Sequence, residues 1–249
     1  CTDRTRARAE EALSTPEAAH LRAEIFESRV NVGKLATLNR HIGEAKEDIV
    51  AVTDTSGILS LDSLKLAAAH FVDRTLGAVG GTYTIFDVDQ GTEVDFWSAQ
   101  TAVKKDEAAL AAPMGLHGAF YAFRRELFVE LRDDTINDDF SLPMGLIERG
   151  YGVAYDPSIL AIELELSSIQ MDFARRRRIG AGNMQQLLRH LRLLDPSRPG
   201  IAIAFASGKG LRPLIPLALI VALSGALWLA PGSWLFSLGA AGQLAGYCA

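Results

Sequence analysis

The last 37 residues of the chain, 213–249, carry no charged side chain, and this feature constrains the fold more than any other. Residues 213–230 are rich in Leu, Ile, Val and Ala and are long enough to cross the hydrocarbon core of a bilayer. A second apolar run begins at Trp234, and Trp228 lies on the other side of a Pro-Gly-Ser break, as aromatic residues do at membrane interfaces. We therefore expect transmembrane helices here; the alternative is a hairpin of buried core helices.

The charges ahead of this tail are distributed unevenly. Residues 175–212 contain nine Lys or Arg side chains and one acid, whereas residues 1–174 contain 16 basic and 29 acidic side chains, a net charge of −13. Basic residues beside a membrane span stay on the cytoplasmic side, so we expect an inner or plasma membrane protein whose acidic body is cytoplasmic. The excess of acid also argues against a nucleic-acid partner.

Composition and chain ends set further limits. The two cysteines, Cys1 and Cys248, stand at the ends of the chain and provide no internal disulfide framework. With 49% hydrophobic and 22% charged residues, the composition excludes a disordered chain. Because the sequence lacks an initiator Met and opens within a motif, we expect it to be truncated at both ends.

The acidic body alternates strand-like and helix-like segments. Residues 48–53 contain the apolar run Ile-Val-Ala-Val, which predicts a strand buried on both faces of a parallel sheet. Further segments predict helices at residues 2–28 (broken at Pro16), 62–72 and 94–110, and strands at residues 76–86 and 151–155. This alternation indicates an α/β architecture, in which ligands bind at the carboxyl ends of strands.

Two motifs near the first strand suit phosphate chemistry. Asp54 follows the strand, and a carboxylate there can hold a divalent cation that neutralises a diphosphate; the alternative is an aspartate that caps a turn. Residues 31–34 (Asn-Val-Gly-Lys) precede a helix, and a helix N-terminus with a nearby lysine suits a phosphate or nucleotide.

Paired acids mark two further candidates. Residues 133–134 and 138–139 are both Asp-Asp, and packing like charges together raises one pKa, which can prepare a general base; acids in a solvated loop are the alternative. Residues 87–89 (Asp-Val-Asp) are similar to an aspartyl-phosphate phosphatase motif with Asp87 as nucleophile, but Gln90 breaks its spacing.

Four consecutive arginines occupy residues 175–178. Guanidinium groups bind phosphate through paired hydrogen bonds, so this run suits a pyrophosphate leaving group. Attraction to anionic lipid is the alternative, and both can hold because four consecutive side chains point in different directions around a helix. Residues 182–194 space leucines at helical intervals beside basic side chains, which predicts an amphipathic helix on the membrane surface.

The order of these motifs resembles that of the membrane-embedded family 2 glycosyltransferases, the group of cellulose, hyaluronan and poly-N-acetylglucosamine synthases. The resemblance runs from residue 1 to about residue 230. It rests on residues 1–5 at the end of an Asp-Gly-Ser-Thr-Asp-x-Thr turn, residues 31–39 for Asn-x-Gly-Lys-x-x-Ala-Leu-Asn, Asp54 for Asp-x-Asp, residues 115–125 for the acceptor-side segment, residues 137–139 for Thr-Glu-Asp, and residues 175–179 for Gln-x-x-Arg-Trp.

The resemblance implies a GT-A fold, a Rossmann-like α/β domain, and inverting transfer from a UDP-sugar to a saccharide or lipid-linked acceptor in polysaccharide synthesis. It implies a cytosolic domain in residues 1–174, a basic motif and interface helix in residues 175–212, and transmembrane segments in residues 213–249. The residue roles that it implies are Asp139 (general base) and Asp138 for catalysis; Asp54 for Mg²⁺ or Mn²⁺; Asp3, Lys34, Asp54, Arg176 and Arg178 for the nucleotide sugar; and Gly115, His117 and Arg124 for the acceptor side.

Several positions depart from the family pattern. Ser56 replaces the second Asp of Asp-x-Asp and leaves Asp54 as the single side-chain carboxylate there. Arg175 and Ile179 replace the Gln and Trp, and in processive synthases this Trp stacks on the acceptor sugar. The family's first strand, with its uracil-contacting Asp, would precede Cys1. These departures leave open a second possibility, a catalytically degenerate, membrane-anchored nucleotide-binding subunit.

Overall fold

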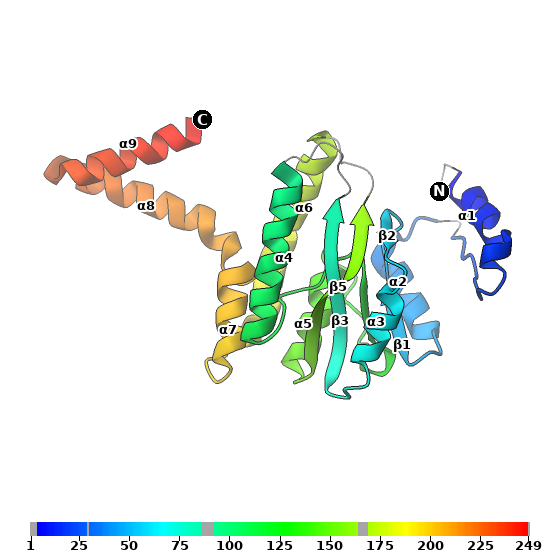
Figure 1. Ribbon diagram of the computed structural model, residues 1–249. Helices are drawn as coiled ribbons and strands as arrows, with labels where there is room; N and C mark the ends of the chain where they lie inside the picture. The colour runs from blue at the N-terminus through cyan, green and yellow to red at the C-terminus, as the bar shows by residue number, and fades with distance from the viewer. Residues whose placement is uncertain (1–3, 29, 86–91, 164–168, 249) are drawn as a thin grey trace.

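A five-stranded sheet lies at the centre of the computed structural model, which describes residues 4–28, 30–85, 92–163 and 169–248 (Figure 1). The strands lie in the order β1-β4-β3-β5-β2. Strands β3 and β5 are parallel, and the other neighbouring pairs are antiparallel. The strands are β1 Ile49–Val52, β2 Gly57–Leu59, β3 Leu76–Ile85, β4 Tyr121–Arg124 and β5 Gly152–Glu163.

The expectation that β1 lies within a parallel sheet is wrong. The strand is present, but it pairs antiparallel with β4 at the edge of the described sheet, with Val52 opposite Tyr121. Val52 is its one buried residue. An apolar run indicates that a strand is covered, but it does not show which distant segment pairs with it or in which direction.

The helices around the sheet match the predicted α/β alternation. They are α2 Gly33–Glu44, α3 Ser63–His70, α4 Thr92–Leu110, α5 Asp138–Glu148 and α6 Ile169–Arg189. The predictions at residues 62–72, 76–86 and 94–110 are confirmed to within two residues, whereas the strand predicted at residues 151–155 continues to Glu163. The N-terminal helical segment contains α1 Thr5–Leu13 and a 3₁₀ turn, Pro16–Ala18.

Both faces of the sheet are covered by a buried cluster. Successive residues of a strand point to opposite faces, so neighbouring residues belong to different clusters. Ala78 of β3 and Phe123 of β4 belong to one buried cluster, together with Phe140 of α5. Their neighbours Val79 and Ala122 belong to a second cluster on the other face. This alternation fixes the ends of β1 and β4 relative to α5, and it thereby positions the residues that follow them.

The prediction of an amphipathic surface helix over residues 182–194 needs correction. Helix α6 ends at Arg189, and Leu191–Leu194 form a 3₁₀ turn. Leu187 and Leu193 are buried in the domain core, whereas Leu188 is 65% exposed. Helical spacing of leucines identifies an apolar face but does not show whether protein or lipid covers it.

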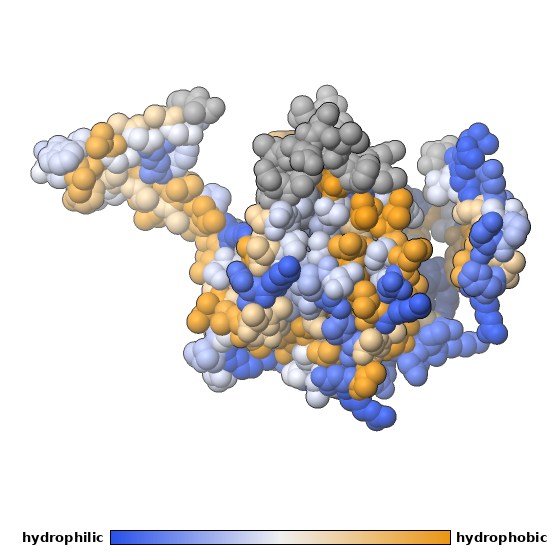
Figure 2. Space-filling model, in the orientation of Figure 1, coloured by the Kyte–Doolittle hydropathy of each residue, from blue (hydrophilic) through white to orange (hydrophobic). Residues whose placement is uncertain are grey.

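The C-terminal part of the chain leaves the domain as two helices. Helix α7 Pro199–Phe205 packs beside α4, and it is followed by the π-helical turn Ala206–Gly210, α8 Ile215–Leu229 and α9 Trp234–Cys248. Figure 1 shows α8 and α9 as a hairpin that projects from the domain, and Figure 2 shows many apolar residues over it. The amide of Gln243 on α9 donates a hydrogen bond to the Leu219 carbonyl on α8 (2.8 Å).

One helical segment in the described part of the chain, Arg212–Gly232, is long and apolar enough to cross a membrane. Its most apolar window has a mean hydropathy of 2.1, and none of that window is buried in the protein. Helix α9, the second apolar run in the sequence, has 15 residues. The structure therefore supports one candidate span by length and composition.

Candidate active site

A cleft of about 300 Å³ opens at the carboxyl ends of β1 and β3, between α4, α5 and α6. Most of the residues that the sequence predicts for a site lie here, although they come from five separate segments. The predicted residues among those lining the cleft are Lys34, Asp54, His117, Asp138, Asp139 and Arg178.

The acidic residues of the cleft come from two element ends. Asp54 follows β1, and Asp138 and Asp139 form the first turn of α5. The positive end of the helix dipole favours carboxylates in a first turn. The hydroxyl of Tyr121 on β4 donates a hydrogen bond to Asp138 Oδ2 (2.9 Å), so the pairing of β4 with β1 also orients α5.

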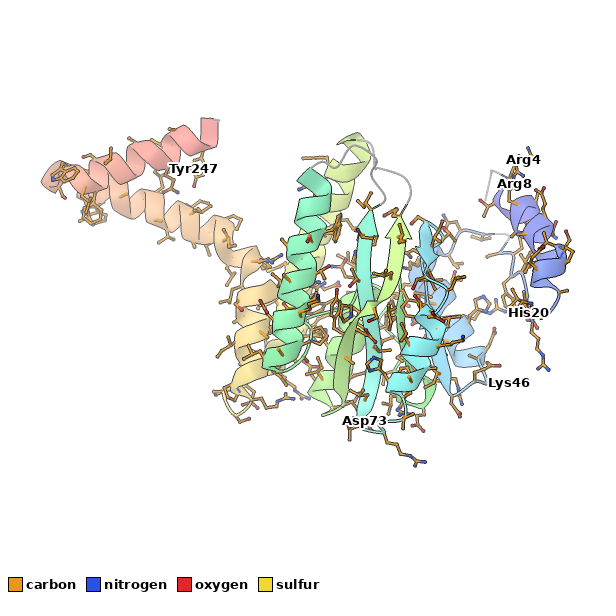
Figure 3. The ribbon with its side chains drawn as sticks, viewed as in Figure 1. Arg4, Arg8, His20, Lys46, Asp73 and Tyr247 are labelled. Carbon is orange, nitrogen blue, oxygen red and sulfur yellow. The ribbon has the colours of Figure 1, made fainter. Side chains whose placement is uncertain are left out.

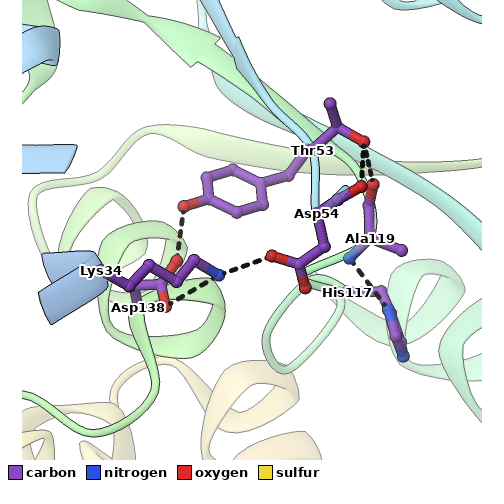
Figure 4. A network of polar contacts seen from close by, with 7 residues as sticks. Lys34, Thr53, Asp54, His117, Ala119 and Asp138 are labelled. Atoms are coloured by element: carbon purple, nitrogen blue, oxygen red, sulfur yellow. Dashed lines mark hydrogen bonds and ion pairs between the residues drawn. The ribbon is translucent and has the colours of Figure 1, made fainter. Parts of the chain in front are cut away.

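Lys34 joins the two acidic segments (Figure 4). Its ammonium nitrogen lies 2.9 Å from Asp54 Oδ1 and 3.5 Å from Asp138 Oδ1. Burial works against the charge of Lys34, but the neighbouring carboxylates outweigh it and raise its pKa. The turn ahead of Lys34 requires glycine, because Gly33 has φ +84°.

Asp139 is the acidic residue of the cleft whose pKa is raised. Burial raises the pKa of its carboxyl group; the ammonium groups of Lys209 and Lys34 oppose this effect, and the charge of Asp138 adds to it. The Leu116 amide donates a hydrogen bond to the Asp139 carbonyl (2.9 Å), which attaches the loop after α4 to α5. A carboxyl group with a raised pKa in a cleft is suited to accept a proton near neutral pH.

Gly118 lets the main chain pass close to both acidic segments, and sequence reasoning missed it. A Cβ at this position would lie 3.2 Å from Asp54 Oδ2 and 3.8 Å from Asp139 Oδ2. Any larger residue would therefore enter the space between the two carboxylates. The sequence could have identified it, because Gly118 lies within the acceptor-side segment at residues 115–125.

An aromatic wall faces these acids. The ring of His117 stacks on Tyr83 with centroids 3.9 Å apart, and Trp97 of α4 meets both rings edge-on at 4.4 and 5.2 Å. The Ala119 amide donates a hydrogen bond to His117 Nδ1 (3.2 Å), which fixes the ring (Figure 4). Such a wall suits a substrate with apolar faces, and Trp97 was absent from the sequence-based set.

The arginine run is divided by the geometry of α6. Arg178 lines the cleft together with Ile179 and Asn183, whereas Arg176 does not. Two residues along an α-helix differ in direction by about 200°. The expected direct contact of Arg176 with a substrate in this cleft is therefore not supported by its position.

The structure does not bring Arg124 to the site, so its expected acceptor-side position is wrong. Arg124 is the last residue of β4, opposite Ile49 at the start of β1, whereas Tyr121 lies at the cleft end. Its guanidinium donates hydrogen bonds to the carbonyls of Phe71 (2.7 Å), Leu76 (2.9 Å) and Asp73 (3.0 Å). Figure 3 labels Asp73 at the end of the sheet where β3 begins.

The other acceptor-side glycine, Gly115, is not among the residues that line the cleft but packs beside Phe140 and Lys209, of which Lys209 lines it. It has φ +80°, and a Cβ there would lie 2.8 Å from Phe140 Cδ2. Asp3 and the Asp-Val-Asp motif at residues 87–89 lie outside the described residues.

The carboxylates of the cleft are the candidate ligands for Mg²⁺ or Mn²⁺. Among the described residues, no group of three or more His, Cys, Asp or Glu side chains is arranged to hold a metal ion. Asp54 keeps one oxygen, Oδ2, free of Lys34, and its side chain is 44% exposed to the cleft. This donor set fits a hard cation that takes one or two carboxylates and completes its shell with substrate phosphates and water.

A scan against models of protein families finds none that matches the chain. The fold is that of a glycosyltransferase: the chain superimposes on the mannosyltransferase PcManGT from Pyrobaculum calidifontis, solved with GDP-Man and Mn²⁺, with a TM-score of 0.63. The match covers 98% of this chain and 72% of that chain at 22% identity.

In sequence, the chain is similar to the poly-beta-1,6-N-acetyl-D-glucosamine synthase of Staphylococcus aureus. The two are 26% identical over 167 residues, which is 64% of this chain and 40% of the synthase. The chain thus spans less than half the length of the curated relatives that it matches. Together, the comparisons give a glycosyltransferase fold and a sequence similarity to a polysaccharide synthase.

Proposed function

We propose that this chain is an inverting family 2 glycosyltransferase that transfers a sugar from a UDP-sugar to a saccharide or lipid-linked acceptor in polysaccharide synthesis. The observation that carries the proposal is the meeting of Lys34, Asp54 and the Asp138–Asp139 pair in one cleft at the carboxyl end of β1. The similarity to poly-beta-1,6-N-acetyl-D-glucosamine synthase supports it.

In the proposed donor half of the cleft, Asp54 would hold Mg²⁺ or Mn²⁺. The bound cation supplies Lewis-acid neutralisation of the departing diphosphate. Lys34 orients Asp54 and adds positive charge beside it. Arg178 faces the same cleft and binds the diphosphate through its guanidinium. Asp3 and Arg176 remain proposed nucleotide contacts. Asp3 lies outside the described residues, and Arg176 is not among the residues that line the cleft.

In the proposed acceptor half, Asp139 is the general base. A hydroxyl of the acceptor attacks the anomeric carbon from the face opposite the diphosphate, and its proton passes to the Asp139 carboxylate. The new bond joins the acceptor oxygen to the anomeric carbon, while the bond from that carbon to the diphosphate breaks. Asp138, Gly115 and His117 shape this half, and the aromatic wall packs against the sugar ring.

We further propose that Arg212–Gly232 anchors the domain in the inner or plasma membrane, with residues 1–174 in the cytoplasm, a basic segment at residues 175–212 and the membrane part at residues 213–249. The unburied apolar surface of α8 and the basic segment ahead of it support this arrangement. It would let a growing polymer or lipid-linked product leave beside the bilayer.

The test uses the full-length protein in membranes with labelled UDP-glucose and UDP-N-acetylglucosamine, in the presence of Mn²⁺ or a chelator. Transfer should require the metal ion and should be lost in Asp139→Asn. Asp133→Asn is the matched control, because Asp133 is exposed and lies outside the cleft. Equal transfer by the wild type and Asp139→Asn contradicts the role of Asp139. UDP binding without transfer from any donor would favour the non-catalytic nucleotide-binding subunit.

A further inference from the structure

One corner of the cleft is basic and is formed by Lys209 and Arg212, to which the proposed function assigns no role. Lys209 lies in the π-helical turn Ala206–Gly210, between α7 and the candidate span, and lines the cleft. Its ammonium nitrogen lies 5.2 Å from the centre of the Phe140 ring. A Cβ on Gly115 would lie only 3.1 Å from this nitrogen, so the glycine leaves the space that Lys209 occupies.

A buried ion pair holds this corner in place. Glu107 Oε2 accepts hydrogen bonds from Lys104 Nζ (2.7 Å) and from the Met114 amide (2.8 Å). Lys104 Nζ also donates to the Met114 carbonyl (2.6 Å). Gly208 packs against the same carboxylate, because a Cβ there would lie 2.6 Å from Glu107 Oε1. Glu107 therefore positions the turn that carries Lys209, while Lys104 neutralises its charge.

The charge of Lys209 remains without a counter-ion in hydrogen-bond contact. Among the described residues, no carboxylate or carbonyl accepts a hydrogen bond from Lys209, and Arg212 at the same cleft has no ion pair there either. Burial lowers the pKa of Lys209, and burial together with Lys209 lowers the pKa of Lys104 to about 8. The charges of Asp139 and Glu107 favour the charged form of Lys209, but an enclosed ammonium that donates no hydrogen bond is costly, and an anion from a ligand would lower that cost.

The position of Asp139 relative to the two lysines indicates whether this anion belongs to the sugar donor or to the acceptor. Lys34 contacts Asp54 and Asp138, whereas Lys209 lies against Gly115 and Phe140. Along α5, Asp139 stands between Asp138, which pairs with Lys34, and Phe140, whose ring Lys209 faces, and both ammonium groups lower the pKa of Asp139. In an inverting displacement the acceptor and the leaving diphosphate occupy opposite faces of the sugar. With the diphosphate at Asp54, the Lys209 corner faces the acceptor.

We propose that Lys209, with Arg212 beside it, binds a phosphate group of the acceptor, and that the acceptor of this chain is therefore a phosphorylated molecule. The inference rests on the proposed function for its assignment to the acceptor. A phosphate carries up to two negative charges, which matches the combined charge of Lys209 and Arg212. The phosphate group can belong to a lipid or to a soluble sugar phosphate, since Lys209 lies next to the candidate span.

The first test measures binding of inorganic phosphate to the full-length protein in the presence of saturating UDP and Mg²⁺, which occupy the donor half. Lys209→Met removes the charge and preserves the length of the side chain, and Lys209→Arg restores the charge. Lys105→Met is the matched control, since Lys105 is an exposed residue of α4 outside the cleft. The affinity for phosphate should fall at least about tenfold in Lys209→Met. Lys105→Met should bind phosphate like the wild type.

The affinity for UDP, measured separately, should stay within about twofold of the wild type in every variant. Unchanged phosphate affinity in Lys209→Met overturns the proposal. An equal loss of UDP affinity also overturns it, because Lys209 would then belong to the donor half.

The second test compares transfer to four acceptors: a polyprenyl phosphate in phosphatidylcholine vesicles, a soluble sugar phosphate, and the dephosphorylated form of each. Lys209→Met should raise the KM for the phosphorylated acceptor that is used, with a smaller effect on kcat. Preference for the vesicle or the soluble form identifies the source of the phosphate. Equal use of a dephosphorylated acceptor overturns the proposal. If UDP and phosphate both bind but no transfer occurs, the proposed function fails and the phosphate site stands.

Discussion

The carboxyl group of Asp139 is influenced by a second carboxylate and by two ammonium groups, and we expect this environment to set the pH at which Asp139 acts as the proposed base. Burial raises the pKa of its carboxyl group above the ordinary 3.8; Lys209 lowers that pKa, and the charge of Asp138 raises it again. A base must be ionised to accept a proton, so kcat/KM should fall as the pH falls through this raised pKa. We expect the acidic limb of the profile above pH 3.8.

The same profile should respond to Asp138→Asn in one direction. Removing the neighbouring negative charge favours ionised Asp139, so the acidic limb should move to lower pH. Asp133→Asn, the exposed control, should leave the limb in place. A limb that moves to higher pH in Asp138→Asn, or that does not move, contradicts the assignment of Asp139 as the titrating base.

The candidate site was predictable where a local motif contains the residue. Asp54 and Lys34 each follow a recognisable turn, and both occupy the cleft as the sequence indicates. Lys209 and Lys104 were not predictable, because they meet only through the packing of the turn after α7 against α4. Arg124 matches a motif, but strand register places it at the wrong end of β4.

At the scale of elements, the contact between α4 and the turn after α7 depends on one glycine. A Cβ on Gly208 would lie 2.6 Å from Glu107 Oε1, and Glu107 is held by two hydrogen bonds. Gly208→Ala should therefore lower the free energy of unfolding by about 1–3 kcal/mol. A lower midpoint in thermal unfolding of the purified protein would show this loss.

Gly145→Ala provides the opposite expectation. Gly145 lies inside α5, and a Cβ there would meet nothing within 4 Å. Alanine favours a helix interior over glycine by roughly 0.5–1 kcal/mol, so this variant should be more stable than the wild type. Equal midpoints for the two alanine variants would show that Gly208 does not control the packing.

Individual elements followed from the sequence more readily than their arrangement. The helix at residues 92–110 and the strand at residues 76–85 were predicted because apolar spacing and turn residues are local signals. The order of the sheet was not, because β1 pairs with β4 across a long stretch of chain. The leucines of residues 182–194 illustrate the same limit: their spacing was visible, but burial of Leu187 in the core was not.

For the whole molecule, the cleft and the candidate span are connected by a short basic segment. Lys209 lines the cleft, and Arg212 both lines it and begins the apolar segment Arg212–Gly232. A change in the orientation of that segment would therefore move cations at the cleft. The unequal distribution of charge along the chain follows this arrangement, because the basic residues lie between an acidic domain and an uncharged hairpin.

The membrane assignment predicts different outcomes for two otherwise matched substitutions. Val221 lies near the middle of Arg212–Gly232 and is 64% exposed, and Val129 lies on the surface of the domain and is 62% exposed. A lysine at the centre of a membrane span costs about 2.5–3.5 kcal/mol, whereas one on a water-exposed surface costs little. Val221→Lys should therefore reduce the fraction of protein that resists alkaline extraction from membranes, and Val129→Lys should not. If both variants are extracted like the wild type, the exposed apolar face of α8 does not contact lipid.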